Sequence, residues 1–136
     1  MNAYTLIKRK PTVDELKRLH TSVGWHNIDD DGIQISLKNT LFSIVARHKD
    51  ETIGLGRVIG DGAMYFYIQD IIVIPEHQGK GVGRMIMDAV MDYVNENARD
   101  HSFVGLMSAK DKAGFYEKYG FKVRGNDRPG MEIWWK

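Results

Sequence analysis

The chain has 136 residues, of which 43% are hydrophobic and 27% charged, and its formal net charge is +1. This length suits one domain with a proper core, and the composition excludes a disordered or fibrous protein. A net charge so close to zero excludes a strong overall field for nucleic acid or an acidic membrane. The absence of cysteine excludes disulfides, thiolate metal sites and a cysteine nucleophile.

The sequence carries no signal for export, membrane insertion or metal binding. Its first ten residues lack a signal-peptide pattern, and no apolar run approaches membrane-spanning length. The lysines and arginines form no basic stripe, and the five histidines include no i,i+4 pair. We therefore expect a single cytoplasmic domain over residues 1–136, with no nucleic-acid or membrane partner and no metal.

The first forty residues predict one strand and two helices. Residues 4–9 alternate as in an edge strand. Thr12 and Glu15 have the spacing of a capping box, and the apolar residues that follow predict a helix over 13–21. Asp31 is expected to cap a short second helix.

Three β-rich runs follow, separated by short turn segments, over residues 41–48, 52–60 and 64–74. Their spacing predicts an antiparallel meander. Beyond them, the strongest helical period of the chain places seven apolar residues between Val82 and Val94 on one stripe. This helix is expected to lie on the sheet.

The last third of the chain predicts a buried strand at 103–109 and a short helix over 112–119. Gly120 suits the left-handed position that ends a helix. The segments 121–124 and 131–135 are expected to be closing strands.

Trp134 and Trp135 would point to opposite faces of such a strand. We expect one of them in the core and the other covered by a second subunit, as in a homodimer. Strands interrupted by helices in this order predict a mixed α/β (α+β) sandwich with helices on both faces of the sheet.

Three glycines stand where the long helix begins, at positions 79, 81 and 83. The N-terminus of a helix binds phosphate through unpaired N–H groups, and glycine lets a ligand oxygen approach them closely. Lys80 and Arg84 add positive charge. Neither the P-loop nor the dinucleotide fingerprint fits, because no hydroxyl residue follows Lys80 and position 84 is not glycine. The alternative is that these glycines only let the chain turn and pack closely.

Two motifs resemble those of the GNAT acyltransferase superfamily. The first is the acetyl-CoA signature Gln/Arg-x-x-Gly-x-Gly/Ala, which stands here at residues 78–83. The second is Phe-Tyr-x-x-x-Gly-Phe, at residues 115–121. The resemblance covers nearly the whole chain and implies a mostly antiparallel sheet with one splayed strand pair. It also implies an N-acetyltransferase that uses acetyl-CoA as co-substrate.

The resemblance further implies where the cofactor lies. The pantetheine arm would enter the splay and pair with backbone groups of Val73 and Ile74, and the pyrophosphate would rest on the amides that begin the long helix. Pro75 fits this scheme because it lacks an N–H group and ends ladder pairing. The residues expected to bind the cofactor are Ile72, Val73, Ile74, Gln78, Gly79, Lys80, Gly81, Val82, Gly83, Arg84 and Phe115.

The same resemblance implies that Tyr116 is the general acid that protonates the CoA thiolate. A phenol is still protonated at neutral pH and so can donate. The alternative is that Tyr116 and Phe115 are aromatic core residues of a helix. The backbone N–H of Val73 is expected to meet the oxyanion.

The sequence leaves two interpretations of the general base that deprotonates the amine. Related polyamine acetyltransferases have a Glu-Asp pair where this chain has Gln69 and Asp70. Either Asp70 accepts the proton, or Gln69 orients a water and the amine arrives deprotonated. Asp70 is equally well explained by a structural hydrogen bond at a strand bend.

We expect substrate contacts from Trp25, Asp29, Asp30 and Gln69, as an aromatic wall with an acidic rim for a small primary amine. The alternative is a core-edge tryptophan beside a solvated turn. Arg57 meets either an anionic group or the carboxylate of Asp70 or Asp61. A protein lysine or N-terminus as the acceptor, and a CoA sensor without turnover, are the alternative functions.

Overall fold

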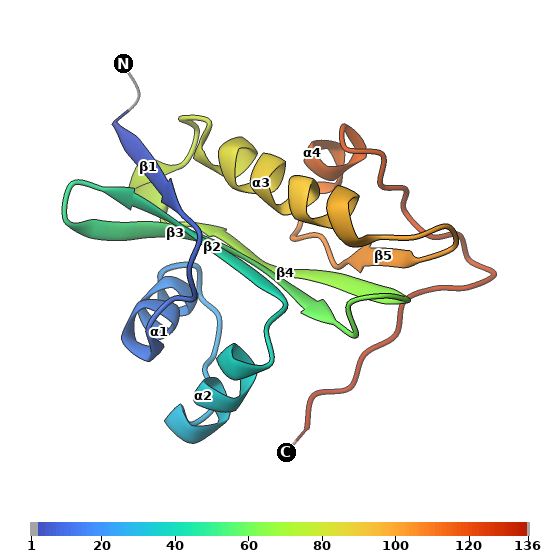
Figure 1. Ribbon diagram of the computed structural model, residues 1–136, viewed down its shortest axis with the longest axis horizontal. Helices are drawn as coiled ribbons and strands as arrows, with labels where there is room; N and C mark the ends of the chain where they lie inside the picture. The colour runs from blue at the N-terminus through green and yellow to red at the C-terminus, as the bar shows by residue number, and fades with distance from the viewer. Residues whose placement is uncertain (1–2, 136) are drawn as a thin grey trace. The chain divides into compact units, whose positions relative to one another are not determined.

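A computed structural model describes residues 3–135 of the chain, which divides into one compact unit up to Leu106 and a smaller one from Met107. The larger unit holds a five-stranded sheet in the order β1-β2-β3-β4-β5 (Figure 1). The first four strands are antiparallel neighbours, which confirms the meander predicted for β2, β3 and β4, and β5 runs parallel to β4. The strands are β1 (Tyr4–Ile7), β2 (Phe42–His48), β3 (Glu51–Gly60), β4 (Tyr65–Val73) and β5 (Phe103–Leu106).

Helices cover both faces of this sheet. The helices of the larger unit are α1 (Val13–Ser22), α2 (Asp30–Lys38) and α3 (Val82–Asn97), with a 3-10 turn at Pro75–His77. Helices α1 and α2 lie on one face and α3 on the other (Figure 1). The predicted mixed α/β sandwich is confirmed.

Two glycines of β3 bring α3 close to the sheet. A Cβ added at Gly56 would stand 2.6 Å from Ile86 Cγ2 and 3.1 Å from Val90 Cγ2, and one at Gly54 would stand 2.9 Å from Ile86 Cδ1. The side chains of Ile86 and Val90 are fully buried there. The stripe predicted on the long helix is thus its sheet-facing side.

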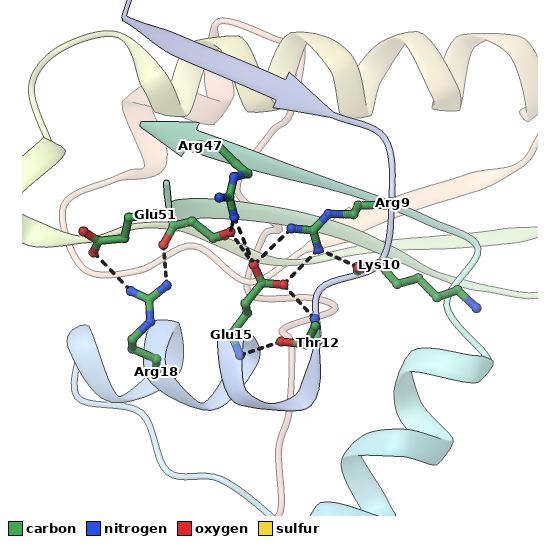
Figure 2. Close-up of polar contacts among 8 residues, drawn as sticks. Arg9, Lys10, Thr12, Glu15, Arg18, Arg47 and Glu51 are labelled. Atoms are coloured by element: carbon green, nitrogen blue, oxygen red, sulfur yellow. Dashed lines mark hydrogen bonds and ion pairs between the residues drawn. The ribbon is translucent and has the colours of Figure 1, made fainter. Parts of the chain in front are cut away.

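The start of α1 is held by Glu15, which is at the centre of a polar network (Figure 2). Thr12 and Glu15 form the predicted capping box. The Glu15 carboxylate also accepts hydrogen bonds from Arg9, at 2.8 and 3.0 Å, and from the Thr52 hydroxyl, and it lies 3.8 Å from Arg47. One side chain therefore ties the β1–α1 connection to strands β2 and β3.

Replacing Glu15 by Gln is expected to lower the free energy of unfolding at pH 7 by about 2–3 kcal/mol. The hydrogen bond from Arg9 is the main cause that lowers the pKa of Glu15 to about 2; burial opposes it, and Thr52 and the Thr12 amide assist. Because this pKa is depressed on folding, the stabilisation is present above about pH 4.5 and is lost as the pH falls towards 2.

Urea unfolding of both proteins at pH 7 and at pH 3 measures this effect, and the difference between the two stabilities should be smaller at the lower pH. Glu51→Gln is the matched control, because that side chain is 56% exposed and pairs with Arg18 at 3.4 Å. The control should unfold like the parent. A Glu15→Gln protein with parental stability at pH 7 would contradict the prediction.

Four local expectations are wrong. The buried strand expected over 103–109 ends at Leu106, and none of its residues is buried. Asp29, and not Asp31, is the N-cap of α2, and its side chain makes no capping hydrogen bond. Residues 121–135 form no strand, so the two closing strands are absent from the part of the chain that the structure describes. Trp134 and Trp135 are 81% and 90% exposed, so neither is a core residue. Both segments have a β-forming sequence, but a strand also requires a paired neighbour.

The smaller unit contains α4 (Ala113–Glu117). Gly120 has a φ of +95° after this helix, as predicted for a left-handed helix end. Aromatic rings cluster around α4: Phe115 and Tyr116 are 5.1 Å apart, and Tyr116 and Phe121 are 6.4 Å apart, between ring centroids. The single domain over 1–136 remains a prediction.

Candidate functional site

A β-bulge interrupts β4 near its end. Arg57 pairs with Gln69 and Leu55 with Ile72, so two residues of β4, Asp70 and Ile71, stand opposite Gly56 alone. Asp70 takes the left-handed conformation, with a φ of +57°. Its side chain is only 2% exposed. The bulge therefore directs a carboxylate into the protein interior.

Strand β4 extends beyond the last residue that pairs with β5. The last pair is Ile68 with Leu106, whereas β4 continues to Val73. Ile74 bonds to other residues through both backbone groups, donating to the Ile53 carbonyl and accepting from the His77 amide. In the antiparallel alternation, Val73 then turns its N–H group away from β3. Val73 and Ile74 are the two residues expected to pair with a ligand through backbone groups. Of these, Val73 has its backbone N–H directed to the open side of β4.

The glycine loop between β4 and α3 has an open front. Gly79 and Gly81 have φ values of +76° and +86°, and a Cβ on either would meet no atom within 4 Å. Gly81 is the N-cap of α3, and no side chain caps the helix there. The amides of Val82 and Gly83, in the first turn, have no acceptor within the helix. This end of α3 can therefore receive an anion.

Gln78 supports the loop from within. Its backbone N–H donates to the Pro75 carbonyl at 3.2 Å, and its side-chain Nε2 donates to the Val73 carbonyl at 2.9 Å. Gln78 therefore joins the loop to β4, and its N–H group is already used. Lys80 and Arg84 are exposed beside the loop, whereas Val82 is buried.

A cavity of about 190 Å³ lies on the α1–α2 face of the sheet at the bulge. Leu16 and Ile33 supply part of its apolar wall. Its polar wall comes from α1, the α1–α2 loop, α2 and strands β3 and β4: His20, His26, Asn27, Ser36, Arg57, Gln69 and Asp70.

Asp70 is bonded on both sides within this wall. One carboxylate oxygen is 2.8 Å from His20 Nε2 and the other is 2.5 Å from Arg57 Nη1. Arg57 also donates to the Thr40 hydroxyl at 3.0 Å. Burial raises the pKa of Asp70, but the hydrogen bond and charge of His20 and those of Arg57 outweigh it, so the pKa lies below its ordinary value. The expected pairing of Arg57 with Asp70 is confirmed, and the arrangement fits the structural reading of Asp70 better than that of a base.

His20 connects this pair to the loop. Its Nδ1 is 2.9 Å from Asn27 Oδ1, while Nε2 faces Asp70. Both ring nitrogens therefore face oxygen atoms, and both bonds form together when the ring carries two N–H groups. Among the residues that the structure describes, His26 is the titratable side chain on the cavity wall that makes no hydrogen bond.

The expected substrate residues are only partly brought together. Gln69 lines the cavity, but Trp25, Asp29 and Asp30 do not. Trp25 packs edge-on against His20, with 5.5 Å between ring centroids, and Asp30 pairs with Lys17 at 2.9 Å. The cavity therefore lacks the predicted acidic rim. His20 and Asn27 were missed, since nothing in their spacing indicates that they share a wall with β4.

Tyr116 and Phe115 lie on α4 of the smaller unit. Burial raises the pKa of the Tyr116 phenol above its ordinary value. The group thus keeps its proton at neutral pH and can act as a hydrogen-bond or proton donor.

Within residues 3–135, no helix is both long enough and apolar enough to cross a bilayer.

Known proteins resemble both the sequence and the fold. A Staphylococcus aureus protein of unknown function, described as a probable acetyltransferase, is 31% identical with a TM-score of 0.91, and the match covers 97% of this chain and 99% of that one. An uncharacterized N-acetyltransferase of Porphyra purpurea is 28% identical over 79% of this chain and 63% of its own length. A histone acetyltransferase of Glycine max is 28% identical over 88% of this chain and 55% of its own length.

The chain thus spans less than two thirds of the length of these two curated relatives. The model of the acetyltransferase (GNAT) domain family matches residues 15–135. That range contains the bulged strand, the glycine loop and α4. The chain belongs to the GNAT acetyltransferase family.

Proposed function

We propose that the chain transfers an acetyl group from acetyl-CoA directly to the primary amine of a small molecule. The observation that carries this proposal is the open glycine-lined N-terminus of α3, which follows the unpaired end of β4. Amides at a helix N-terminus favour a phosphate group, and an unpaired strand edge favours an extended chain that carries amides of its own. Acetyl-CoA, the donor in this family, contains both.

The donor would be held by backbone groups more than by side chains. The first-turn amides of α3 receive the pyrophosphate, and Lys80 and Arg84 add charge at the surface. The side chain of Gln78 holds the loop against β4. The N–H of Val73 pairs with the pantetheine arm or meets the oxyanion.

The reaction needs one bond formed, one broken and one proton delivered. The neutral amine nitrogen attacks the thioester carbonyl, and a C–N bond replaces the C–S bond. The Val73 N–H stabilises the negative oxygen of the tetrahedral intermediate. Tyr116 protonates the departing thiolate and regains its proton from water. The amine loses its own proton to water, which Gln69 helps to orient in the cavity.

The cavity supports a small acceptor. Its volume of about 190 Å³ is less than that of a drug-sized ligand site. Its carboxylate is already engaged by Arg57 and His20, so it offers no free negative charge to a polycation. A protein acceptor is the second candidate, since one relative is a histone acetyltransferase.

A thiol reagent that reports CoA release tests the proposal. Acetyl-CoA is supplied with a panel of small amines and, separately, with lysine-containing and N-terminally free peptides. We expect release with at least one small amine and little with peptides. Release of CoA with peptides alone would indicate a protein acceptor instead of a small molecule. Tight CoA binding without release with any acceptor would indicate a sensor.

Replacing Gly81 by Ala is expected to raise the Kd for CoA about tenfold. A residue with a Cβ is strained by roughly 1–2 kcal/mol at the φ of +86° found here, so the loop would leave this conformation. Isothermal titration calorimetry measures the change. Gly130→Ala is the control, because its Cβ would meet no atom within 4 Å and its backbone is not left-handed. An unchanged Kd for CoA in Gly81→Ala would show that the glycine loop does not bind CoA.

A further inference from the structure

The wall of the cavity at the β4 bulge has one carboxylate, and that carboxylate is fully engaged. Among the described residues of the larger unit, Asp70 is the one acidic side chain that lines this cavity. Its two oxygens face His20 and Arg57, one each. Asp30 lies off the wall and pairs with Lys17 at 2.9 Å. A ligand therefore meets no unpaired carboxylate on the wall that the larger unit supplies.

The hydrogen bonds of His20 require a positively charged ring. Asn27 Nδ2 donates to the Lys17 carbonyl at 3.4 Å, which turns Asn27 Oδ1 toward His20 Nδ1 at 2.9 Å. An amide oxygen and an ionised carboxylate accept hydrogen bonds and cannot donate them, so both ring nitrogens donate when the two bonds are formed. His20 and Arg57 then contribute two positive charges against the one negative charge of Asp70. The wall thus has an excess of positive charge.

The polar groups left for a ligand include several N–H donors. Arg57 makes four hydrogen bonds, which leave one of its five N–H groups, on Nη1, without an acceptor among the described residues. The side chains of His26 and Gln69 also line the cavity and make no hydrogen bond within the described part of the chain. Each of these groups can donate to a negatively charged oxygen.

We propose that the amine acceptor also carries an anionic group, a carboxylate or a phosphate, which lies against His26 and the pair formed by His20 and Arg57. This inference rests on the proposed function and narrows its substrate class. The amine at the other end of the molecule faces Gln69, whose strand continues to Val73. An anionic group is attracted by the excess positive charge, whereas a second ammonium group is repelled by it.

The burial of the charged pair makes this selection effective. The side chains of Arg57 and Asp70 are only 9% and 2% exposed, so salt screens their charges less than those on an open surface. One unit charge at ~6 Å changes a binding constant roughly 100-fold when the effective dielectric constant is about 20. Because salt still screens part of this effect, we expect a preference of at least about tenfold for an anionic amine.

A matched set of amines in the thiol-reagent assay gives the first test. Butylamine, γ-aminobutyrate and diaminobutane share a carbon skeleton and differ in the charge at the far end, and ethanolamine and phosphoethanolamine form a second pair that tests phosphate. We expect kcat/KM to be at least about tenfold higher for an anionic amine than for its neutral partner, and lowest for diaminobutane. Equal or higher values for the neutral amines or diaminobutane would overturn the inference and leave the proposed function intact.

A binding measurement decides the inference without turnover. The protein is saturated with CoA, which has no acetyl group to transfer, and each amine is added in a calorimeter. The anionic amine should bind at least about tenfold more tightly than its neutral partner. Absence of CoA release with every small amine would contradict the proposed function, and the order of binding would still test the inference. Equal binding of the paired amines, or no binding of either anionic amine, would overturn it.

Replacing His26 by Glu tests the position of the anionic group. His26 is exposed in the α1–α2 loop, so the variant should fold, which circular dichroism verifies. It should weaken binding of the preferred anionic amine about tenfold and strengthen binding of diaminobutane. His101→Glu is the matched control, because His101 is also an exposed histidine and does not line the cavity. Equal effects of the two substitutions, or a parental order of binding in His26→Glu, would overturn the proposal.

Discussion

Replacing Tyr116 by Phe is expected to slow CoA release about 10²–10⁴-fold with the preferred amine, while the Kd for acetyl-CoA stays near that of the parent. The substitution removes only the phenolic oxygen and keeps the ring that packs against Phe115 and Phe121. A rate loss without an affinity loss is the mark of a group that acts in the transition state. Steady-state kinetics and calorimetry on the same two proteins measure both quantities.

The pH dependence gives a second readout of Tyr116. Burial raises the pKa of this phenol, so its acid form persists through neutral and mildly alkaline pH. The rate should therefore not fall between pH 7 and 9 because of this group. Tyr119→Phe is the matched control, since Tyr119 is also a ring neighbour of Phe115, at 5.7 Å. Equal rates in the parent and Tyr116→Phe would assign Tyr116 to packing alone.

Signals that act over a few residues predicted the elements of the larger unit. Thr12 and Glu15 are three positions apart and fix the start of α1 by bonds between themselves. The apolar stripe of α3 is set by the helical repeat, and the loop glycines by their left-handed backbone. These features depend on local geometry, so a sequence displays them directly.

The cavity at the β4 bulge depends on residue pairs that local signals do not reveal. His20 and Asp70 are 50 positions apart, and Arg57 and Asp70 are 13 apart across a bulged pair of strands. Until the bulge is known, Asp70 has no predictable face, because one extra residue reverses the alternation of side chains. The prediction of the closing strands was wrong for a related reason. A β-forming sequence favours an extended backbone, but a strand also needs the edge of another strand to pair with.

Replacing Asp70 by Asn is expected to lower the free energy of unfolding by about 3–5 kcal/mol at pH 7. Arg57 has a side chain only 9% exposed and would be left with an uncompensated charge, and His20 would lose its carboxylate partner. Asn tolerates the left-handed backbone that Asp70 adopts, so the change isolates the charge from the strain. Urea unfolding gives the value, and Asp31→Asn, on the exposed side of α2, should change it by less than about 0.5 kcal/mol.

The sign of the pH dependence follows from the lowered pKa of Asp70. The stabilisation is present above the unfolded pKa, near ~4, and is lost as the pH falls through the folded value, so the parent and the variant converge in acid. Adding Arg57→Met to Asp70→Asn should recover part of the loss, because a buried pair removed together leaves no orphan charge.

Activity separates this structural role from that of a base. If Asp70 only holds Arg57 and His20 in the cavity wall, folded Asp70→Asn protein at saturating amine should release CoA with the same pH profile as the parent and a raised KM for the amine. If Asp70 accepts the proton, kcat itself should fall, and added base in the buffer should restore part of it. Loss of kcat with parental stability would assign the Asp70 carboxylate to the chemistry, whereas loss of stability with parental kcat would assign it to the structure of the cavity wall.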